Sequence, residues 1–171
     1  MDFIELVTNR ESIRSYDSQR PLSQEVLTQI LEAGRLAPSA ANRQPWRFIV
    51  VSSEAKLAEI RTVYTRPWFS DAPHVLVIVG NKEQSWKRND GYNSIETDLT
   101  IAADHLILAA ESLGVSTCWI GNFDYVRLRL VLELNNDEVV FALTPLGYSK
   151  DRFEKKGEKV RKAFDEVVKF I

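Results

Sequence analysis

Cysteine is almost absent from this chain of 171 residues, since Cys118 is its only example. A single thiol excludes an internal disulfide and any zinc or iron–sulfur site that needs several cysteines. The two histidines, His74 and His105, do not lie at metal-ligand spacing, so the sequence predicts no metal site. Cys118 falls in a predicted strand, and we interpret it as a small core residue rather than a catalytic thiol.

Long apolar runs are also missing, and the longest, such as residues 75–79, are far too short to cross a bilayer. The N-terminus reads MDFIELVTNRES and lacks the basic region and apolar stretch of a signal peptide. These absences predict a cytoplasmic protein that does not bind membranes. The net charge of -2 provides no overall attraction for a polyanion, which argues against a dedicated nucleic-acid binder.

The composition is that of a folded protein, with 44% hydrophobic and 27% charged residues. We found no internal repeat, low-complexity segment or linker, so the sequence predicts one domain over residues 1–171. Segment 100–113 is apolar on most faces, which indicates a helix buried at the centre and ended by Gly114. Further helices are expected after the capping residues Asp2, Ser23, Ser53 and Asp124 and over residues 158–170, with strands at 47–52, 74–80, 115–120 and 139–146. This order predicts a three-layer α/β or α+β domain.

Four clusters contain side chains suited to a ligand. Arg10, Ser12 and Arg14 can face one side of a turn and offer two guanidinium groups and a hydroxyl to phosphate or carbonyl oxygens. The basic tail, residues 150–162, has a local charge balance of about +4 and could hold a phosphate of charge near -2. Each cluster has an ordinary alternative, a solvated charged turn for the first and a solvated face for the tail.

Two loops complete the set. Residues 38–46, PSAANRQPW, form an irregular loop that can place a serine and backbone amides against a planar ligand, or simply a rigid turn. Residues 117–124, TCWIGNFD, pass from a strand end to a capped helix, which is a favoured ligand position but also an ordinary connection. Residues 86–93, WKRNDGYN, fit either a mobile loop over a pocket or a surface connection.

Taken in this order, the clusters resemble the nitroreductase family. Residues 10–16 are similar to its R-x-S-x-R-x-[FY] element, and LAPSAANRQPWRF over 36–48 is similar to its most recognisable segment. Three later stretches add to the resemblance, which spans essentially the whole chain: LGVSTCWIGNFD at 113–124, PLGY at 145–148 and KVRKAFDEVV at 159–168.

The resemblance implies an α+β fold with a central, mostly antiparallel sheet and helices on both faces. It also implies an intertwined homodimer with two FMN molecules at the interface. Arg10 and Ser12 would contact the phosphate and ribityl chain, and Arg14 the N1 and C2-carbonyl edge of the flavin. The other implied contacts are Pro38, Ser39 and Ala40 from the other subunit, Asn42 and Gln44 in the same loop, Trp119, Ile120, Gly121 and Asn122 along the ring, and Lys159 and Arg161 at the phosphate.

The implied activity is hydride transfer from NADH or NADPH through FMN to a small electrophile such as a nitroaromatic or quinone, by a ping-pong mechanism. Arg14 is the expected catalytic residue, because its charge would stabilise the electron-rich N1 edge. Two alternatives remain: a flavin enzyme of the same fold that dehalogenates, desaturates or fragments its flavin, and a binding module without turnover.

This chain departs from the family pattern in two places. Glu11 stands where the family usually has a basic residue, which puts the affinity for phosphate in doubt. The helical excursion that longer members insert before the central helix is reduced to about residues 81–93, so the acceptor cannot be inferred from the resemblance.

Overall fold

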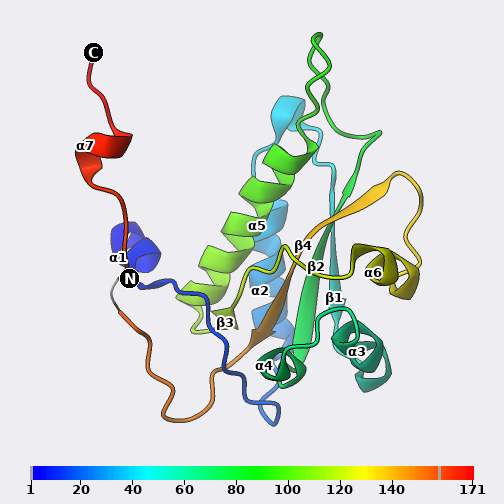
Figure 1. Ribbon diagram of the computed structural model, residues 1–171, viewed down its shortest axis with the longest axis vertical. Helices are drawn as coiled ribbons and strands as arrows, with labels where there is room; N and C mark the ends of the chain where they lie inside the picture. Colours follow the sequence, from blue (N-terminus) through cyan, green and yellow to red (C-terminus); the bar gives the residue numbers. More distant parts are fainter. Residues whose placement is uncertain (1, 158) are drawn as a thin grey trace.

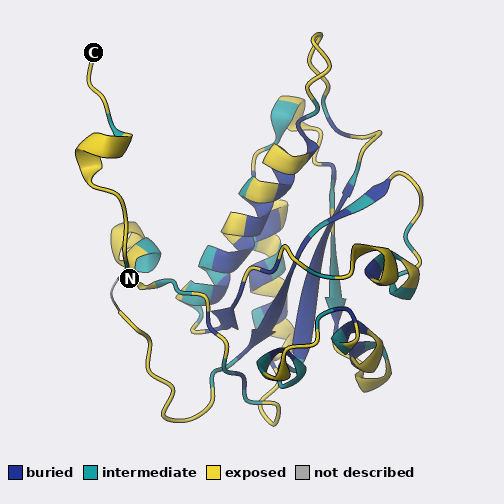
Figure 2. Ribbon diagram, in the orientation of Figure 1, coloured by how far each residue is buried: buried dark blue, intermediate teal, exposed yellow. Residues whose placement is uncertain are grey.

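The computed structural model describes residues 2–157 and 159–171, and its centre is a four-stranded antiparallel sheet (Figure 1). The strands are β1 (Trp46–Val51), β2 (His74–Asn81), β3 (Ser116–Thr117) and β4 (Glu138–Gly147). Their order across the sheet is β1-β2-β4-β3, and every neighbouring pair runs antiparallel. The central strand β2 is buried along almost its whole length, as its apolar sequence predicts (Figure 2).

Helices cover both faces of this sheet. On one face lie α2 (Gln24–Arg35) and the central helix α5 (Ile95–Ser112). On the other lie α3 (Glu54–Arg61), α4 (Pro67–Ser70) and α6 (Tyr125–Val131) (Figure 1). The expected α+β fold with an antiparallel sheet between helical layers is therefore confirmed.

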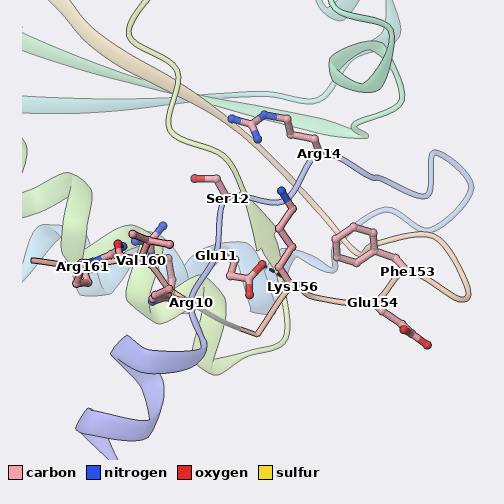
Figure 3. Close-up of a pocket in the computed structure, with 10 residues that line it drawn as sticks. Arg10, Glu11, Ser12, Arg14, Phe153, Glu154, Lys156, Val160 and Arg161 are labelled. Carbon is pink, nitrogen blue, oxygen red and sulfur yellow. Dashed lines mark hydrogen bonds between the residues drawn. The ribbon is translucent and has the colours of Figure 1, made fainter.

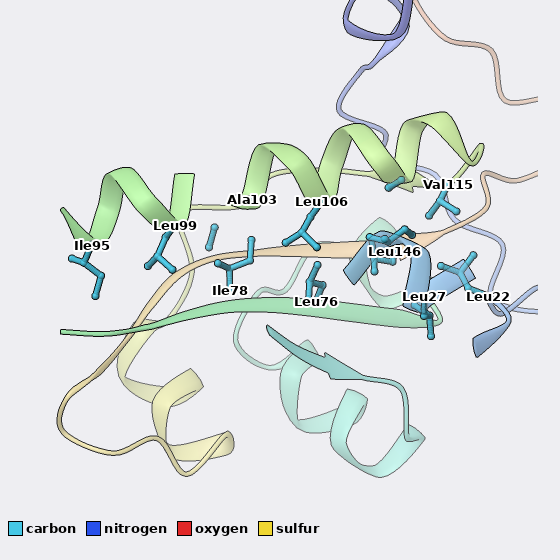
Figure 4. Packing of buried hydrophobic residues seen from close by; sticks show 13 residues of the cluster. Leu22, Leu27, Leu76, Ile78, Ile95, Leu99, Ala103, Leu106, Val115 and Leu146 are labelled. Carbon is cyan, nitrogen blue, oxygen red and sulfur yellow. The ribbon is translucent and has the colours of Figure 1, made fainter. Parts of the chain in front are cut away.

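The structure has two hydrophobic clusters, one on each face of the sheet, because successive side chains of β2 point to opposite faces. Leu76 and Ile78 point toward α5, where they pack with Leu99 and Leu106 in one hydrophobic cluster (Figure 4). The intervening valines of β2 point to the other cluster, beneath α3, α4 and α6. Burial of the apolar face of α5 contributes about 25 cal/mol for each Å² removed from water, which makes this helix a main source of stability. None of the described helices is both long enough and apolar enough to span a membrane.

Most predicted helix ends are confirmed. The carboxylate of Asp2 accepts the amide N–H of Glu5 and begins α1 (Phe3–Asn9). The side chains of Ser23 and Asp124 begin α2 and α6 in the same way. Ser53 stands at the start of α3, although its side chain makes no capping hydrogen bond. Gly114 ends α5 in the left-handed conformation, with φ of 70°.

Several boundaries differ from the prediction. Helix α5 begins at Ile95 rather than at 100, because its first turn contains polar residues that hide the apolar pattern. Strand β3 has only two residues instead of the six expected, and α6 ends at Val131 rather than at Leu134. The short helix α4 has no counterpart in the prediction.

The prediction of a final helix over 158–170 is wrong. The only helical turn in this stretch is α7 (Phe164–Val167), and residue 158 lies outside the described residues. The segment runs past α1 and away from the sheet, and almost all of it is exposed (Figures 1 and 2). A short helix needs a surface against which its apolar face can pack, and the described residues of the chain leave Phe164, Val167 and Phe170 exposed.

His74, the first residue of β2, is a buried histidine whose two ring nitrogens are both hydrogen-bonded. Nε2 accepts the amide N–H of Leu22 at 3.0 Å, so Nδ1 carries the proton and donates to Oγ of Ser52 at 2.7 Å. Burial lowers the pKa of His74 from its ordinary value of 6.5. The folded protein therefore holds this ring neutral.

We predict that the stability of the protein falls as the pH drops below about 6.5. In this range His74 becomes protonated in the unfolded chain but stays neutral in the folded protein. The loss should level off once the pH passes below the lowered pKa of the folded state. His74→Gln can keep both hydrogen bonds without titrating, so its stability should vary less over this range. Urea unfolding at pH 7.5 and 5.5 measures the difference, and His105→Gln, on the exposed face of α5, serves as control. Equal pH dependence in wild type and His74→Gln would contradict the prediction.

Candidate functional site

The N-terminal cluster lies in an extended segment between α1 and α2, not in the predicted turn. The amide of Ile13 donates to the carbonyl of Thr117 at 2.8 Å, which ties the segment to β3. Ile13 is buried in the core, so its neighbours along the alternating backbone point the other way. Arg10, Ser12 and Arg14 consequently share one face of the segment.

Arg14 and Cys118 lie close together at this edge of the sheet. The guanidinium carbon of Arg14 is 5.9 Å from the centre of the Trp68 ring, at the distance of a cation–π contact. Cys118 is 2% exposed, and burial raises the pKa of its thiol, against the opposing influence of Arg14 and Ser12. The cysteine therefore remains a protonated thiol rather than a nucleophilic thiolate.

A cleft of about 520 Å³ joins the N-terminal cluster to the basic tail (Figure 3). Its basic lining residues are Arg10, Arg14, Lys156, Lys159 and Arg161, and its acidic ones are Glu11 and Glu154. The pKa of Lys159 is lowered, first by burial and then by the positive charges of Arg10 and Arg161. Positive charges that repel one another in this way are suited to an anion with several oxygens, such as a phosphate.

The tail is fastened to the N-terminal segment by contacts that the sequence did not reveal. The carboxylate of Glu11 accepts the amide N–H groups of Lys156 at 3.1 Å and Gly157 at 2.7 Å. Lys155 donates to the carbonyl of Asn9 at 3.0 Å and pairs with Glu111 at the end of α5. Glu11 is thus bound to the tail backbone.

Residues 38–44 form a tight loop with an unusual backbone. Ala41, Asn42 and Gln44 have φ values of 49°, 54° and 50°, which residues other than glycine rarely adopt. The hydroxyl of Ser39 accepts the amide N–H of Gln44 at 2.9 Å, and the side-chain amide of Gln44 donates to Asn42. Such conformations cost energy and are concentrated at ligand-binding sites.

Asp98 in α5 holds this loop in place and was missed by the sequence analysis. Its carboxylate accepts the amide N–H of Ala40 at 2.8 Å and the hydroxyl of Ser94 at 2.7 Å, and the residue is 1% exposed. The available signal was a single acidic residue at a core position of an apolar helix, since a buried carboxylate needs partners.

The third predicted segment, Trp119 to Asn122, follows β3 along the sheet. Ile120 is buried and exchanges two backbone hydrogen bonds with Leu143 of β4. Trp119 is 38% exposed and meets the ring of Phe141 edge-on, and Gly121 and Asn122 are exposed. The segment therefore presents a partly open aromatic surface.

Within one chain, the loop 38–44 and the cleft do not meet. The loop is attached to the first turn of α5 through Asp98, whereas the tail is attached to its last turn through Glu111. At a rise of ~1.5 Å per residue these two anchors are about 20 Å apart along the helix axis. The structure thus brings together Arg10, Ser12, Arg14, Lys159 and Arg161, and it keeps the loop with Pro38, Ser39, Ala40, Asn42 and Gln44 at the other end of α5.

Residues 86–93 form a hairpin beside the loop end of α5. Lys87 and Asn93 are bridged in antiparallel fashion, and the hairpin projects beyond the start of α5 (Figure 1). The guanidinium of Arg88 lies 4.9 Å from the Tyr92 ring and pairs with Asp90 at 2.8 Å. The hairpin does not line the cleft.

The structure defines an α+β protein with a basic cleft, and the comparisons give its family. The model of the nitroreductase family matches residues 7–64 and 56–148. A protein of Archaeoglobus fulgidus named "Putative NADH dehydrogenase/NAD(P)H nitroreductase" is 33% identical over an alignment of 153 residues, and the match covers 86% of each chain. This chain belongs to the nitroreductase family.

Two solved structures support the assignment of the fold. A nitroreductase family protein from Clostridium difficile 630 superposes with a TM-score of 0.88 at 30% identity, covering 99% of this chain and 98% of that one. An FMN-dependent nitroreductase from Clostridium difficile R20291 superposes with a TM-score of 0.82 at 29% identity, covering 98% of both chains.

Replacement of Asp98 by alanine is predicted to destabilise the protein by about 2–3 kcal/mol, because the amide of Ala40 and the hydroxyl of Ser94 lose their buried partner. Urea unfolding measures the change. Glu96→Ala removes an exposed acid from the same turn of α5 and should cost less than about 0.5 kcal/mol. A cost for Asp98→Ala no larger than that of the control would show that the loop does not depend on this carboxylate.

Proposed function

We propose that this protein is an FMN-dependent oxidoreductase that transfers hydride from NAD(P)H to a small electrophilic acceptor, such as a nitroaromatic or a quinone. The observation that carries the proposal is the cleft, in which the N-terminal Arg-x-Ser-x-Arg element and the tail pair Lys159 and Arg161 line one basic cavity. The names of the family members reported above, an NAD(P)H nitroreductase and an FMN-dependent nitroreductase, agree with it.

The donors of the cleft fit the chemistry of FMN. Arg10, Ser12, Lys159 and Arg161 would hold the phosphate and ribityl oxygens, since guanidinium, ammonium and hydroxyl groups are the usual partners of such oxygens. Arg14 would lie at the N1 and C2-carbonyl edge of the ring. The carboxylate of Glu11 accepts two backbone amides of the tail, which offset part of its repulsion of a phosphate.

FMN, when bound, supplies the redox centre that accepts hydride from the nicotinamide and passes it to the acceptor. The protein then contributes placement and charge. Arg14 would stabilise negative charge at the N1 edge, a preorganised interaction typically worth about 3 kcal/mol when it strengthens during the reaction. The nicotinamide and the electrophilic acceptor would occupy the same position in turn, which would give ping-pong kinetics.

The complete site would require a homodimer. The anchor of the loop 38–44 on α5 is about 20 Å along the helix from the anchor of the tail, so a second copy would bring its loop to the cleft. The surface also contains large apolar side chains that one chain leaves uncovered: Phe3, Ile4, Leu36, Val160, Phe164, Val167, Phe170 and Ile171. Covering them in a second subunit would supply the energy of association.

For the activity, we predict that the purified protein is yellow and that NADH or NADPH bleaches it in the absence of oxygen. In Arg14→Ala the bleaching should be slower by about 100-fold, because the charge at the N1 edge is lost. Stopped-flow absorbance measures both. Arg127→Ala, which removes an exposed arginine that does not line the cleft, should react like the wild type.

The outcomes are distinct. A colourless protein that takes up no added FMN would contradict the proposed function. A yellow protein whose reduction is as fast in Arg14→Ala as in the wild type would remove Arg14 from the mechanism and leave the cofactor assignment intact.

For the shared site, we predict that two defective variants restore each other. Arg10→Glu replaces a positive charge of the cleft by a negative one. Ser39→Asp adds a negative charge to the loop while keeping an acceptor for the amide of Gln44. A dimer with one copy of each contains one site built entirely from wild-type elements. Mixed dimers, isolated through two different tags, should therefore bind FMN when neither parent does. Mixed dimers that bind FMN no better than the two parent variants would show that each site lies within one chain.

A further inference from the structure

Glu11 joins the two halves of the cleft. Its backbone belongs to the N-terminal segment, between Arg10 and Ser12 (Figure 3). Its carboxylate accepts two consecutive amide N–H groups of the tail, from Lys156 and Gly157. Consecutive amides that converge on one anion form a recurrent anion-binding arrangement of the backbone. Here the anion is a side chain of the same protein.

The tail conformation at this point is specific. Gly157 has φ of 73°, in the left-handed region that favours glycine. On either side of this turn, Lys155 donates to the carbonyl of Asn9 and Lys159 donates to the carbonyl of Val7. Residues 155–159, as far as the structure describes them, thus follow the N-terminal segment through contacts centred on Glu11.

We propose that Glu11 is a positioning residue that holds the tail against the N-terminal segment, so that Lys159 and Arg161 face the same phosphate as Arg10. This inference rests on the proposed function. It gives the acidic residue, which departs from the family pattern, a constructive part in cofactor binding.

Two effects of Glu11 have opposite signs, which makes the proposal testable. As a bare charge in the cleft, Glu11 repels a phosphate, and its removal should tighten FMN binding. As a positioning residue it holds the basic groups together, and its removal should weaken binding. Its negative charge also counteracts the repulsion of Lys159 by Arg10 and Arg161, since Glu11 opposes the lowering of the Lys159 pKa.

Glu154 provides a matched control. It is an exposed carboxylate that lines the same cleft and makes no hydrogen bond with any residue that the structure describes. Glu154→Ala removes the same charge without releasing the tail. In Glu154→Ala only the repulsion between the carboxylate and the phosphate is lost, so FMN binding should stay unchanged or become tighter.

The test is titration of the apoprotein with FMN, followed by quenching of the flavin fluorescence. Glu11→Ala should bind FMN about tenfold more weakly than the wild type, the size expected for loss of charged hydrogen bonds at an exposed site. Glu11→Gln keeps one acceptor oxygen and should recover most of the lost affinity. Binding by Glu11→Ala as tight as in the wild type or tighter would overturn the proposal.

A second measurement needs no cofactor. Hydrogen exchange of peptides that contain the amides of Lys156 and Gly157 should be faster in apo Glu11→Ala than in wild type and Glu154→Ala. Unchanged exchange would overturn the proposal even if the flavin affinity fell. A wild-type protein that binds no FMN would instead contradict the proposed function, and the exchange experiment would still decide whether Glu11 holds the tail.

Discussion

The packing of α5 against the sheet determines where each part of the candidate site lies. Leu99 and Leu106 bury one face of the helix against β2 in a close-packed layer. Asp98 at one end holds the strained loop, and Glu111 at the other end holds the tail. The helix of 18 residues therefore separates the loop 38–44 from the tail.

The site itself depends on like charges held close together. Burial is the first cause that lowers the pKa of Lys159, and repulsion by Arg10 and Arg161 lowers it further. Glu11 and Glu111 offset part of this repulsion, and both are bound to the tail. Under the proposed function, a bound phosphate would relieve the remaining repulsion.

The layers of the fold could be predicted from the sequence because their signals are local. The apolar run of β2, the capping residues Asp2, Ser23 and Asp124, and the terminating Gly114 each act within a few neighbouring residues. The candidate residues were found through a resemblance to a family, since charged turns and irregular loops have ordinary explanations when taken alone. Asp98 and the contacts of Glu11 could not be foreseen, because they join positions 58 and 146 residues apart.

The tail shows most clearly why local reasoning has a limit. Phe164, Val167 and Phe170 are spaced like one face of a helix, yet the segment forms only a single turn. Periodicity shows that a face must be covered but not which molecule covers it. In this chain the tail runs past α1 and leaves its own sheet (Figure 1). A partner of the same sequence, as proposed above, would cover these apolar residues and would bring a second cleft to the loop 38–44.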